Sequence, residues 1–399
     1  MAGNANLGAA RAAKNDEFYT RWNDIENEMQ AYLEYDPDVF RDKTILLPCD
    51  DPDWSNFTKY FAERFEQLGL KKLISTSYAA DGGNGKVFVI EGENEPQWEY
   101  LTGDGDFRSA EVTALRDEAD IVVTNPPYSL FREFMTWLND GGVEFAVIGN
   151  FNSITYKEIF PLIQDNKMWL GQPVPRGSMW FTIPDNMVDS ISKRDKTCFR
   201  IEDGQAQARR PACWFTNIEH GRRHEPLRLM SMKENQKYNK QIIANANSYK
   251  QYDNYDAIEV PVVAGIPSDY AGVQGVPISF LDKYSPDQFE ILGMAKTPIC
   301  YSNSQSAKRT RTYENVTQIS KDGKRSGGNQ VNGSPAIVVS TEPVGQTHYL
   351  TDEVDGYLIS LYPRILIRHR NPERKEARPL GGQSSLRCKR GFSHVEARG

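Results

Sequence analysis

Strand and helix patterns alternate along residues 43–165, and this alternation limits the fold more than any other feature of the sequence. The apolar run KTILLPC (43–49) indicates a buried strand, and the aromatic periodicity of DWSNFTKYFAERFEQLG (53–69) indicates an amphipathic helix. Further strand and helix patterns follow in turn up to EFAVIGN (144–150) and TYKEIFPLIQD (155–165). This order predicts an α/β fold with a mostly parallel sheet and helices on both faces.

The alternation fades beyond residue 165, which divides the chain into parts of different character. Short aromatic strand patterns separated by charged loops follow, and one later stretch is polar and rich in Gly and Ser, which is typical of a mobile loop. We therefore expect a flexible N-terminal arm (1–14), an α/β domain (15–165), a less regular C-terminal region (166–370) with a mobile loop at about 303–335, and a basic, disordered tail (371–399).

The segment Asn125-Pro126-Pro127-Tyr128 directly follows the strand pattern DIVVT, where a parallel sheet binds its ligands. An exocyclic amine of a nucleobase is a weak nucleophile because its lone pair is delocalised into the ring. Two acceptors on its N–H bonds would localise that pair. The Asn125 side-chain oxygen can be one acceptor, and a carbonyl held by the two rigid prolines can be the other. The Tyr128 ring offers a surface on which a planar base can stack.

The alternative is that these prolines merely stiffen a strand-to-helix connection and that Asn125 caps the following helix. An Asn-Pro-Pro-aromatic sequence arises by chance in few chains of this size. Its position at the end of a buried strand makes chance less plausible still. The pattern therefore favours catalysis on an amino group.

Charge is unevenly distributed along the chain. The net charge of −7 by itself argues against a nucleic-acid partner, but basic residues outnumber acidic ones in residues 193–228, 300–330 and 364–399. An acidic body with basic segments is compatible with a phosphate-binding face, although solvated surface charge and a basic tail explain it equally well. The five cysteines are scattered and form no CxxC pair, so we expect no disulfide framework, no metal site and a reducing, cytoplasmic compartment.

Ordered segments of the chain resemble the EcoRI-type adenine-specific DNA methyltransferase family, whose amino-methyltransferase motif is similar to Asn125–Tyr128. The matching segments, in order, are NDEFYT, PCDDPDWSNFTKYF, LGLKKLI, GDGDFRS, DIVVTNPPYSLFRE, NSITYKE, YDNYDAIEV, GVPISFL and YPRILIRHR. The resemblance extends over about 15–295 and 357–370. It implies a Rossmann-like sheet in 15–165 that binds S-adenosylmethionine, and a C-terminal target-recognition region that docks DNA. The implied reaction is methyl transfer to N6 of an adenine flipped out of duplex DNA.

The resemblance also implies which residues surround the cofactor. They are Phe18, Tyr19, Thr20, Cys49, Asp50, Asp51, Ser75, Asp104, Asp106, Phe107 and Asn125. Asp50 or Asp51 would bind the amino group of the cofactor, in a loop that lacks the family's usual glycine. Ser75 or Ser77 would stand in for the acidic residue that usually binds ribose, and Asp106 with Phe107 would read the adenine ring. The alternatives are helix caps and a turn of Asx type.

Two aromatic and five basic residues are candidates for contacts with DNA. Phe181, or its neighbour Trp180, would form the second face of a sandwich around the flipped base, although aromatic residues in strands more often belong to the core. The basic candidates for phosphate or guanine contacts are Arg176, Arg209, Arg210, Arg222 and Arg223. The alternative for each of these arginines is an ordinary surface position, where water solvates the charge and no ligand is bound.

The expected partner is duplex DNA, with no membrane, and the enzyme is expected to be a monomer. A modification enzyme of this kind would protect DNA from a cognate restriction endonuclease that acts on the same site, but the sequence does not show whether that nuclease exists. The resemblance suggests GAATTC as the target. Other activities stay open: N4-cytosine or RNA adenine methylation, protein-glutamine methylation, and a catalytically idle DNA-binding protein.

Overall fold

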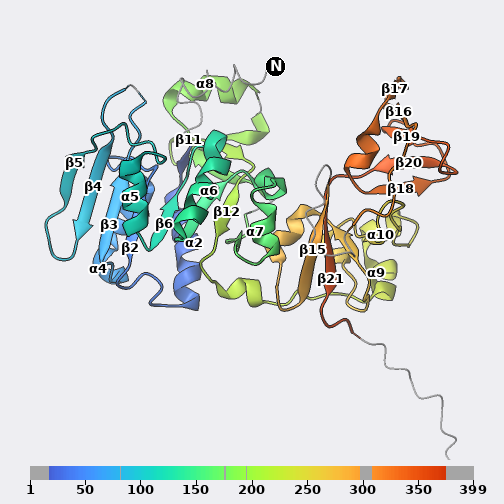
Figure 1. Cartoon of the computed structure of the whole chain (residues 1–399), viewed down its shortest axis with the longest axis horizontal. Coiled ribbons are helices and arrows are strands. Elements are labelled where there is room, and N and C mark those ends of the chain that lie inside the picture. Colours follow the sequence, from blue (N-terminus) through green and yellow to red (C-terminus); the bar gives the residue numbers. More distant parts are fainter. Residues whose placement is uncertain (1–17, 81, 175–176, 195, 297–307, 374–399) are drawn as a thin grey trace, which may run out of the picture.

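The computed structural model describes residues 18–80, 82–174, 177–194, 196–296 and 308–373. Its largest element is an eight-stranded sheet with the order β5-β4-β3-β2-β6-β7-β12-β8 (Figure 1). The four central strands run parallel: β3 (Lys72–Thr76), β2 (Thr44–Leu47), β6 (Ile121–Thr124) and β7 (Glu144–Gly149). The flanking strands are antiparallel: β4 (Lys86–Glu91), β5 (Gln97–Tyr100), β12 (Cys213–Thr216) and β8 (Trp169–Leu170). The sheet is therefore mixed, with the predicted parallel order at its centre.

Two of these strands correct the expected domain boundary at residue 165. β12 pairs with β7 in the register Cys213↔Gly149 to Thr216↔Ala146, and β8 pairs with β12. All four β12 residues are buried. The sequence does not reveal this because a long connection separates β12 from β7, and strand pairing over that distance depends on tertiary contacts.

Helices cover both faces of the sheet because successive strand residues point to opposite sides. Leu46 and Val122 face a core built with α5 (Ala110–Glu118), α6 (Phe131–Gly141) and α7 (Phe160–Gln164). Ile45 and Val123 face a second core built with α2 (Trp22–Tyr35), α3 (Asn56–Glu63) and α4 (Phe65–Leu68). The mixed α/β architecture fits a methyltransferase fold. None of the described helices has the length and apolar character needed to cross a membrane.

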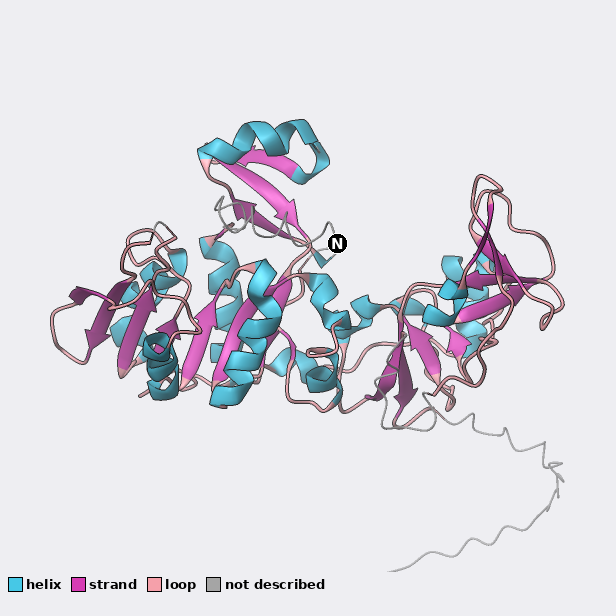
Figure 2. Ribbon diagram, turned by 45° about the horizontal axis from the view of Figure 1, so that its top comes forward, coloured by secondary structure: helices cyan, strands magenta, loops and turns pink. Residues whose placement is uncertain are grey.

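A small antiparallel sheet lies above the large one in Figures 1 and 2. Its order is β1 (Tyr19–Thr20), β9 (Met179–Thr182), β11 (Gln205–Arg210) and β10 (Phe199–Glu202). α8 (Asp185–Arg194) shares its buried core through Ile191. β1 pairs with β9, and the residue before it, Phe18, contacts Asn125, so the beginning of the described chain lies beside the Asn125–Tyr128 segment.

The C-terminal region contains two further sheets, on the right of Figure 2. The first consists of β13 (Ile258–Glu259), β14 (Gln274–Val276), β21 (Arg364–His369) and β15 (Phe289–Ala295). Two short helices, α9 (Met232–Tyr238) and α10 (Lys240–Ala244), precede it. The second is inserted between β15 and β21 and consists of β17 (Arg325–Gly327), β16 (Thr317–Ile319), β19 (His348–Leu350), β20 (Tyr357–Ser360) and β18 (Ala336–Val339).

The expectation of a mobile loop at 303–335 is corrected here. The described part of that segment contains β16, β17 and a 3-10 turn (Asn329–Gly333). All three residues of β17 are exposed, and Arg-Ser-Gly shows no apolar alternation. The strand depends on pairing with β16, which pairs in turn with β19. The expected arm at 1–14 and most of the expected tail lie outside the described residues.

Candidate active site

The Asn125–Tyr128 segment, the expected catalytic motif, lies between β6 and α6. β6 ends at Thr124, and Pro126 and Pro127 cannot donate backbone hydrogen bonds that would continue the ladder. Tyr128 then begins a 3-10 turn (Tyr128–Leu130) that leads directly into α6. The two prolines therefore convert a buried strand into a helix within three residues and leave Asn125 at the carboxyl edge of the sheet.

The side-chain amide of Asn125 has a defined orientation. Its Nδ2 donates a hydrogen bond of 2.8 Å to the backbone carbonyl of Phe18. Its Oδ1 is shielded from solvent and has no hydrogen-bond partner among the described residues. A buried acceptor without a partner costs about 1–3 kcal/mol. The structure thus keeps the amide oxygen available for a donor that arrives from elsewhere.

Aromatic rings form one wall beside the motif. The Phe18 ring lies 6.4 Å from the Tyr128 ring and 5.9 Å from the Phe181 ring, centroid to centroid. The Arg210 guanidinium lies 4.8 Å from the centre of the Phe18 ring. Phe181 is completely buried in the core, which is the alternative stated for this residue. The ring in contact with Tyr128 is that of Phe18, which belongs to the same core.

Trp180 lies in β9, where successive side chains point to opposite faces, so its ring is on the face away from that of Phe181. The guanidinium groups of Arg200 and Arg209 lie 4.3 Å and 5.8 Å from the centre of its ring. A stacked arginine occupies the surface that a base would need. The expected role of Trp180 as the second face of a sandwich with Tyr128 is therefore not supported by this arrangement.

Asp50 follows β2 and is almost fully buried. Its Oδ1 accepts a hydrogen bond of 2.8 Å from the Ser55 hydroxyl, and its Oδ2 accepts one of 2.6 Å from the Thr124 hydroxyl. Burial raises the pKa of the Asp50 carboxyl to about 7, although both hydroxyl donors act in the opposite direction. Asp51 is more exposed and forms an ion pair of 3.4 Å with Lys86. Of the two carboxylates, Asp51 is the more accessible to a positively charged group of a ligand.

The ribose-binding role expected for Ser75 is corrected by its surroundings. The Ser75 hydroxyl donates to the Asp50 carbonyl at 2.7 Å and lies 2.7 Å from the Thr58 hydroxyl. The residue is completely buried. Its hydrogen bonds fasten β3 to β2 and α3, so it does not present a free hydroxyl to a ligand.

Asp106 and Phe107, the pair expected to read the adenine ring, are also engaged within the protein. The Asp106 carboxylate accepts a hydrogen bond of 2.9 Å from the Arg108 Nε, and the buried Phe107 ring packs 4.9 Å from the Phe134 ring. The Asp104 carboxylate accepts from the Asp106 backbone N–H at 3.0 Å, which is the Asx turn that was the alternative here. Asp104 and Asp106 stay near the sheet edge, whereas Phe107 belongs to the α5–α6 core.

The first described residues contribute a second buried polar group without a partner among the described residues. The Thr20 hydroxyl is shielded from solvent and has no hydrogen-bond partner among the described residues. The Thr20 carbonyl accepts a hydrogen bond of 2.8 Å from the Asn56 side chain, and the Tyr19 ring packs edge-on against Trp54 at 4.4 Å. Cys49 lies beside Asp50 and its side chain is mostly shielded from solvent, so burial and the neighbouring carboxylate raise the pKa of its thiol.

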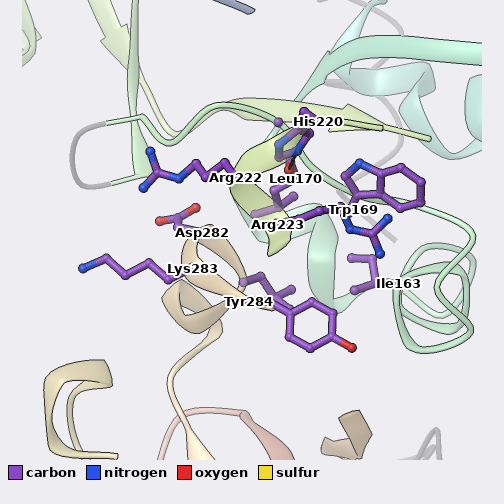
Figure 3. A pocket seen from close by; sticks show the side chains of 11 residues that line it. Ile163, Trp169, Leu170, His220, Arg222, Arg223, Asp282, Lys283 and Tyr284 are labelled. Carbon is purple, nitrogen blue, oxygen red and sulfur yellow. Dashed lines mark hydrogen bonds between the residues drawn. The ribbon is translucent and has the colours of Figure 1, made fainter. Parts of the chain in front are cut away.

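The basic candidates divide into two groups. Arg209 and Arg210 lie on β11; Arg210 contacts the Phe18 ring beside Asn125–Tyr128, whereas Arg209 points to the opposite face and stacks on Trp180. Arg222 and Arg223 line a pocket between β8 and the 3-10 turn Ile278–Lys283, where Arg222 extends beside Asp282 (Figure 3). Arg176 lies outside the described residues.

The role expected for Arg223 in DNA binding is corrected, because its side chain is buried. Its guanidinium stacks 3.7 Å from the centre of the Trp169 ring and forms an ion pair of 3.0 Å with Glu219. Among the described residues, no group of three or more His, Cys, Asp or Glu side chains could hold a metal ion.

Sequence reasoning did not single out Ser55, Asn56 or Thr124, which the structure joins to the expected site residues. Ser55 could have been recognised as the N-cap of α3, since it precedes the aromatic helix pattern and accepts from the Phe57 N–H. Thr124 offers no local signal beyond its position directly before Asn125. The roles of Asn56 and Thr124 appear only in their contacts with residues far away in the sequence.

Comparison with known proteins identifies the family. A family model described as "Adenine-specific methyltransferase EcoRI" matches residues 6–341. The chain belongs to this family. The Type II methyltransferase M.EcoRI of Escherichia coli is 43% identical over 317 residues, covering 74% of this chain and 92% of that protein. The Type II methyltransferase M.MpnI of Mycoplasma pneumoniae is 36% identical over 290 residues, covering 72% of this chain and 85% of that protein.

A third relative, the Type II methyltransferase M.MgeORF184P of Mycoplasma genitalium, is 36% identical over 295 residues. No solved structure matches the chain. The prediction of the family from sequence segments is confirmed, and the chain is an adenine-specific methyltransferase. Because the family description specifies adenine, it does not favour the N4-cytosine alternative.

Proposed function

We propose that this enzyme methylates N6 of an adenine rotated out of duplex DNA, with S-adenosylmethionine as the methyl donor. It would act in the cytoplasm as a modification enzyme that protects DNA from restriction. One observation carries the proposal: the Asn125 amide is fixed by the Phe18 carbonyl so that its oxygen, a buried acceptor, has no partner among the described residues. An N6 amino group is a donor that this oxygen can accept.

The chain's own groups would prepare the amine for reaction. Asn125 Oδ1 accepts one N6–H bond, and a carbonyl of the Pro126-Pro127 segment accepts the other. These bonds draw the nitrogen toward tetrahedral geometry and localise its lone pair. Tyr128 supports the base by stacking. No charged base is needed, because the proton can leave once the nitrogen has become cationic. Since the Asn125 oxygen is shielded in this structure, groups that cover it must move to admit the base.

The residues at the sheet edge fit a methionine-derived cofactor in part. The buried Thr20 hydroxyl, without a partner among the described residues, can donate to a carboxylate. The Asp51 carboxylate, 20% exposed and now paired with Lys86 and the Asp53 N–H, can accept from an amino group that takes the place of the lysine. When bound, S-adenosylmethionine supplies an electrophilic methyl group on a sulfonium. Ser75 and Phe107 are occupied elsewhere, so we assign them no cofactor contact.

Catalysis and DNA recognition would be carried out by different sheets of the molecule. The parallel order β3-β2-β6-β7 supports a Rossmann-like catalytic domain, extended by β12 and β8. Arg210 lies against the Phe18 ring beside the motif, where DNA phosphates would approach a flipped base. Arg209 points to the opposite face of the small sheet, where it stacks on Trp180. The C-terminal sheets, outside the parallel core, are the proposed target-recognition region. We expect the enzyme to act as a monomer on each strand of its site.

Asn125→Ala tests this function directly. The variant removes the acceptor without adding bulk, so we expect methyl transfer to duplex DNA to fall by at least about a hundredfold, with cofactor and DNA affinity little changed. Transfer of labelled methyl from S-adenosylmethionine to DNA measures it, and mapping of methylated bases identifies the target. Asn139→Ala, at an exposed position of α6, is the matched control and should leave turnover unchanged.

Near-normal turnover of the Asn125→Ala variant would refute the assigned role. The same assay with RNA as acceptor separates the remaining nucleic-acid alternative. Wild-type enzyme that methylates neither DNA nor RNA while it binds DNA would support the idle DNA-binding alternative instead.

A further inference from the structure

We propose that Asp50 is a positioning residue of the reaction: its carboxylate holds Asn125 in place through two hydrogen-bonded branches, one through Thr124 and one through α3 and β1. This inference rests on the proposed function of Asn125. It gives Asp50 a different role from the one first expected, which was direct binding of the cofactor's amino group.

The first branch runs through the last residue of β6. The Thr124 hydroxyl donates to Asp50 Oδ2 at 2.6 Å, and Thr124 is completely buried. Asn125 follows directly, so this bond fixes the point from which its backbone leaves the sheet. When the Asp50 carboxyl is ionised, such a hydrogen bond is stronger than one between neutral groups.

The second branch runs through the beginning of α3. The Ser55 hydroxyl donates to Asp50 Oδ1 at 2.8 Å, and Ser55 also caps α3 by accepting from the Phe57 N–H at 3.1 Å. The next residue, Asn56, donates its side-chain amide to the Thr20 carbonyl at 2.8 Å. Ser55 thus sets the start of a helix whose first residue holds the strand β1.

The two branches meet at the Asn125 side chain. β1 is preceded by Phe18, whose carbonyl accepts the Asn125 Nδ2 at 2.8 Å. A closed path therefore leads from Asp50 to Thr124 and Asn125, and returns through Phe18–Thr20, Asn56 and Ser55. Rotation of the Asn125 amide by 180° would break the bond to Phe18 and present an N–H group to the incoming amine. The path prevents that rotation and keeps the acceptor facing the reacting nitrogen.

Asp50 is itself held firmly, as a positioning residue must be. Its backbone N–H donates to the Thr76 carbonyl at 3.0 Å, and its own carbonyl accepts from the Ser75 hydroxyl at 2.7 Å. Both carboxylate oxygens are engaged by hydroxyl groups and the residue is 5% exposed. Asp51, beside it, is the carboxylate that remains accessible. The geometry assigns positioning to Asp50 and leaves ligand contact to its neighbour.

The test is a pair of variants at Thr124, with Asn125 left intact. Thr124→Val removes the hydroxyl and keeps the shape, whereas Thr124→Ser keeps the hydroxyl and removes a methyl group. We expect Thr124→Val to lower kcat by about tenfold or more, with the KM for S-adenosylmethionine changed by less than about twofold. Thr124→Ser should retain kcat within about threefold of wild type, because the bond to Asp50 can re-form.

Two results would overturn the proposal. Equal impairment of the Val and Ser variants would show that packing matters and the hydroxyl does not. A rise in the KM for S-adenosylmethionine at unchanged kcat would return Asp50 to cofactor binding. Wild-type and Asn125→Ala enzymes, measured alongside, report on the proposed function by themselves, so its failure is recognised independently of the Thr124 result.

The second branch provides an independent measurement if Thr124→Val does not fold, as judged by urea denaturation. Ser55→Ala removes the donor to Asp50, and Ser55→Thr retains a hydroxyl there. The proposal expects a lower kcat for the alanine variant at unchanged KM for S-adenosylmethionine, with recovery in the threonine variant. Unchanged kcat in Ser55→Ala would refute the branch through α3.

Discussion

At the scale of single residues, buried polar groups in this protein are oriented by partners that are far away in sequence. The Asn125 amide is set by the Phe18 carbonyl, and Asp50 is set by Thr124 and Ser55. These groups cost free energy to bury, so their positions are restricted to those in which hydrogen bonds compensate. The site is therefore built from polar groups that have few alternative positions.

Glu28 on α2 is a buried carboxyl outside the site and gives a prediction about pH. It accepts hydrogen bonds from the Tyr32 hydroxyl at 2.6 Å and from the Gln172 backbone N–H at 2.8 Å. Burial raises its pKa from 4.5 to about 7. Because the folded protein binds this proton more tightly than the unfolded chain, the associated stability is fully present below pH 4.5 and is lost as the pH rises to about 7.

We expect Glu28→Gln to flatten the fall of the unfolding free energy between pH 4.5 and 7. The slope of unfolding free energy against pH should change by nearly the amount expected for one bound proton, about 1.4 kcal/mol per pH unit. Urea denaturation at several pH values measures it. Glu34→Gln, at an exposed position of the same helix, is the control and should leave the slope unchanged. A slope as steep as that of wild type in Glu28→Gln would contradict the prediction. The raised pKa of Asp50 adds a pH dependence of the same sign to the stability of all three proteins, so its contribution cancels when they are compared.

At the scale of elements, the edge of the central sheet depends on close approaches between loops. Gly105 has a φ of +82° and lies against the Ser77 carbonyl at the end of β3, where a Cβ atom would collide with that oxygen. This contact brings the loop of Asp104 and Asp106 to the carboxyl edge of the sheet. Backbone packing, rather than side-chain attraction, thus places these two carboxylates near β2 and β3.

Gly105→Ala should therefore destabilise the protein more than the cost of its backbone conformation. A left-handed φ costs a non-glycine residue about 1–2 kcal/mol, and the collision adds to this. Gly204→Ala is the matched control, because Gly204 has a φ of +75° with open space around it. The difference between their unfolding free energies in urea isolates the collision. Equal losses in the two variants would show that the loop moves away freely.

At the scale of the whole molecule, the net charge of −7 coexists with basic segments in the C-terminal half. If a basic face binds the DNA backbone, each phosphate contact releases counterions, so affinity should fall steeply as salt is added. Titrations of wild-type enzyme with duplex DNA between 50 and 200 mM salt, a range over which several contacts change affinity by orders of magnitude, measure the slope. Binding of S-adenosylmethionine under the same conditions is the control. A flat response of DNA affinity would contradict the basic-face proposal.

The sequence by itself determined the features that depend on neighbouring residues. The 2- and 3.6-residue periodicities located β2, β3, β6, β7, α5 and α6, and two consecutive prolines after a buried strand located the connection that carries the proposed catalytic residues. Ordered sequence segments were also enough to identify the family, which the comparisons confirmed.

The tertiary structure decided every feature that depends on contacts between distant residues. Ser75, Phe107, Phe181 and Arg223 could each contact a ligand as far as sequence shows, but each is buried by its partners. β12 joins the central sheet across a long connection, and Asp50 reaches Asn125 through Thr124. A residue's type fixes what it can bind, whereas its burial and its hydrogen-bond partners, which only folding sets, decide whether it is available to bind.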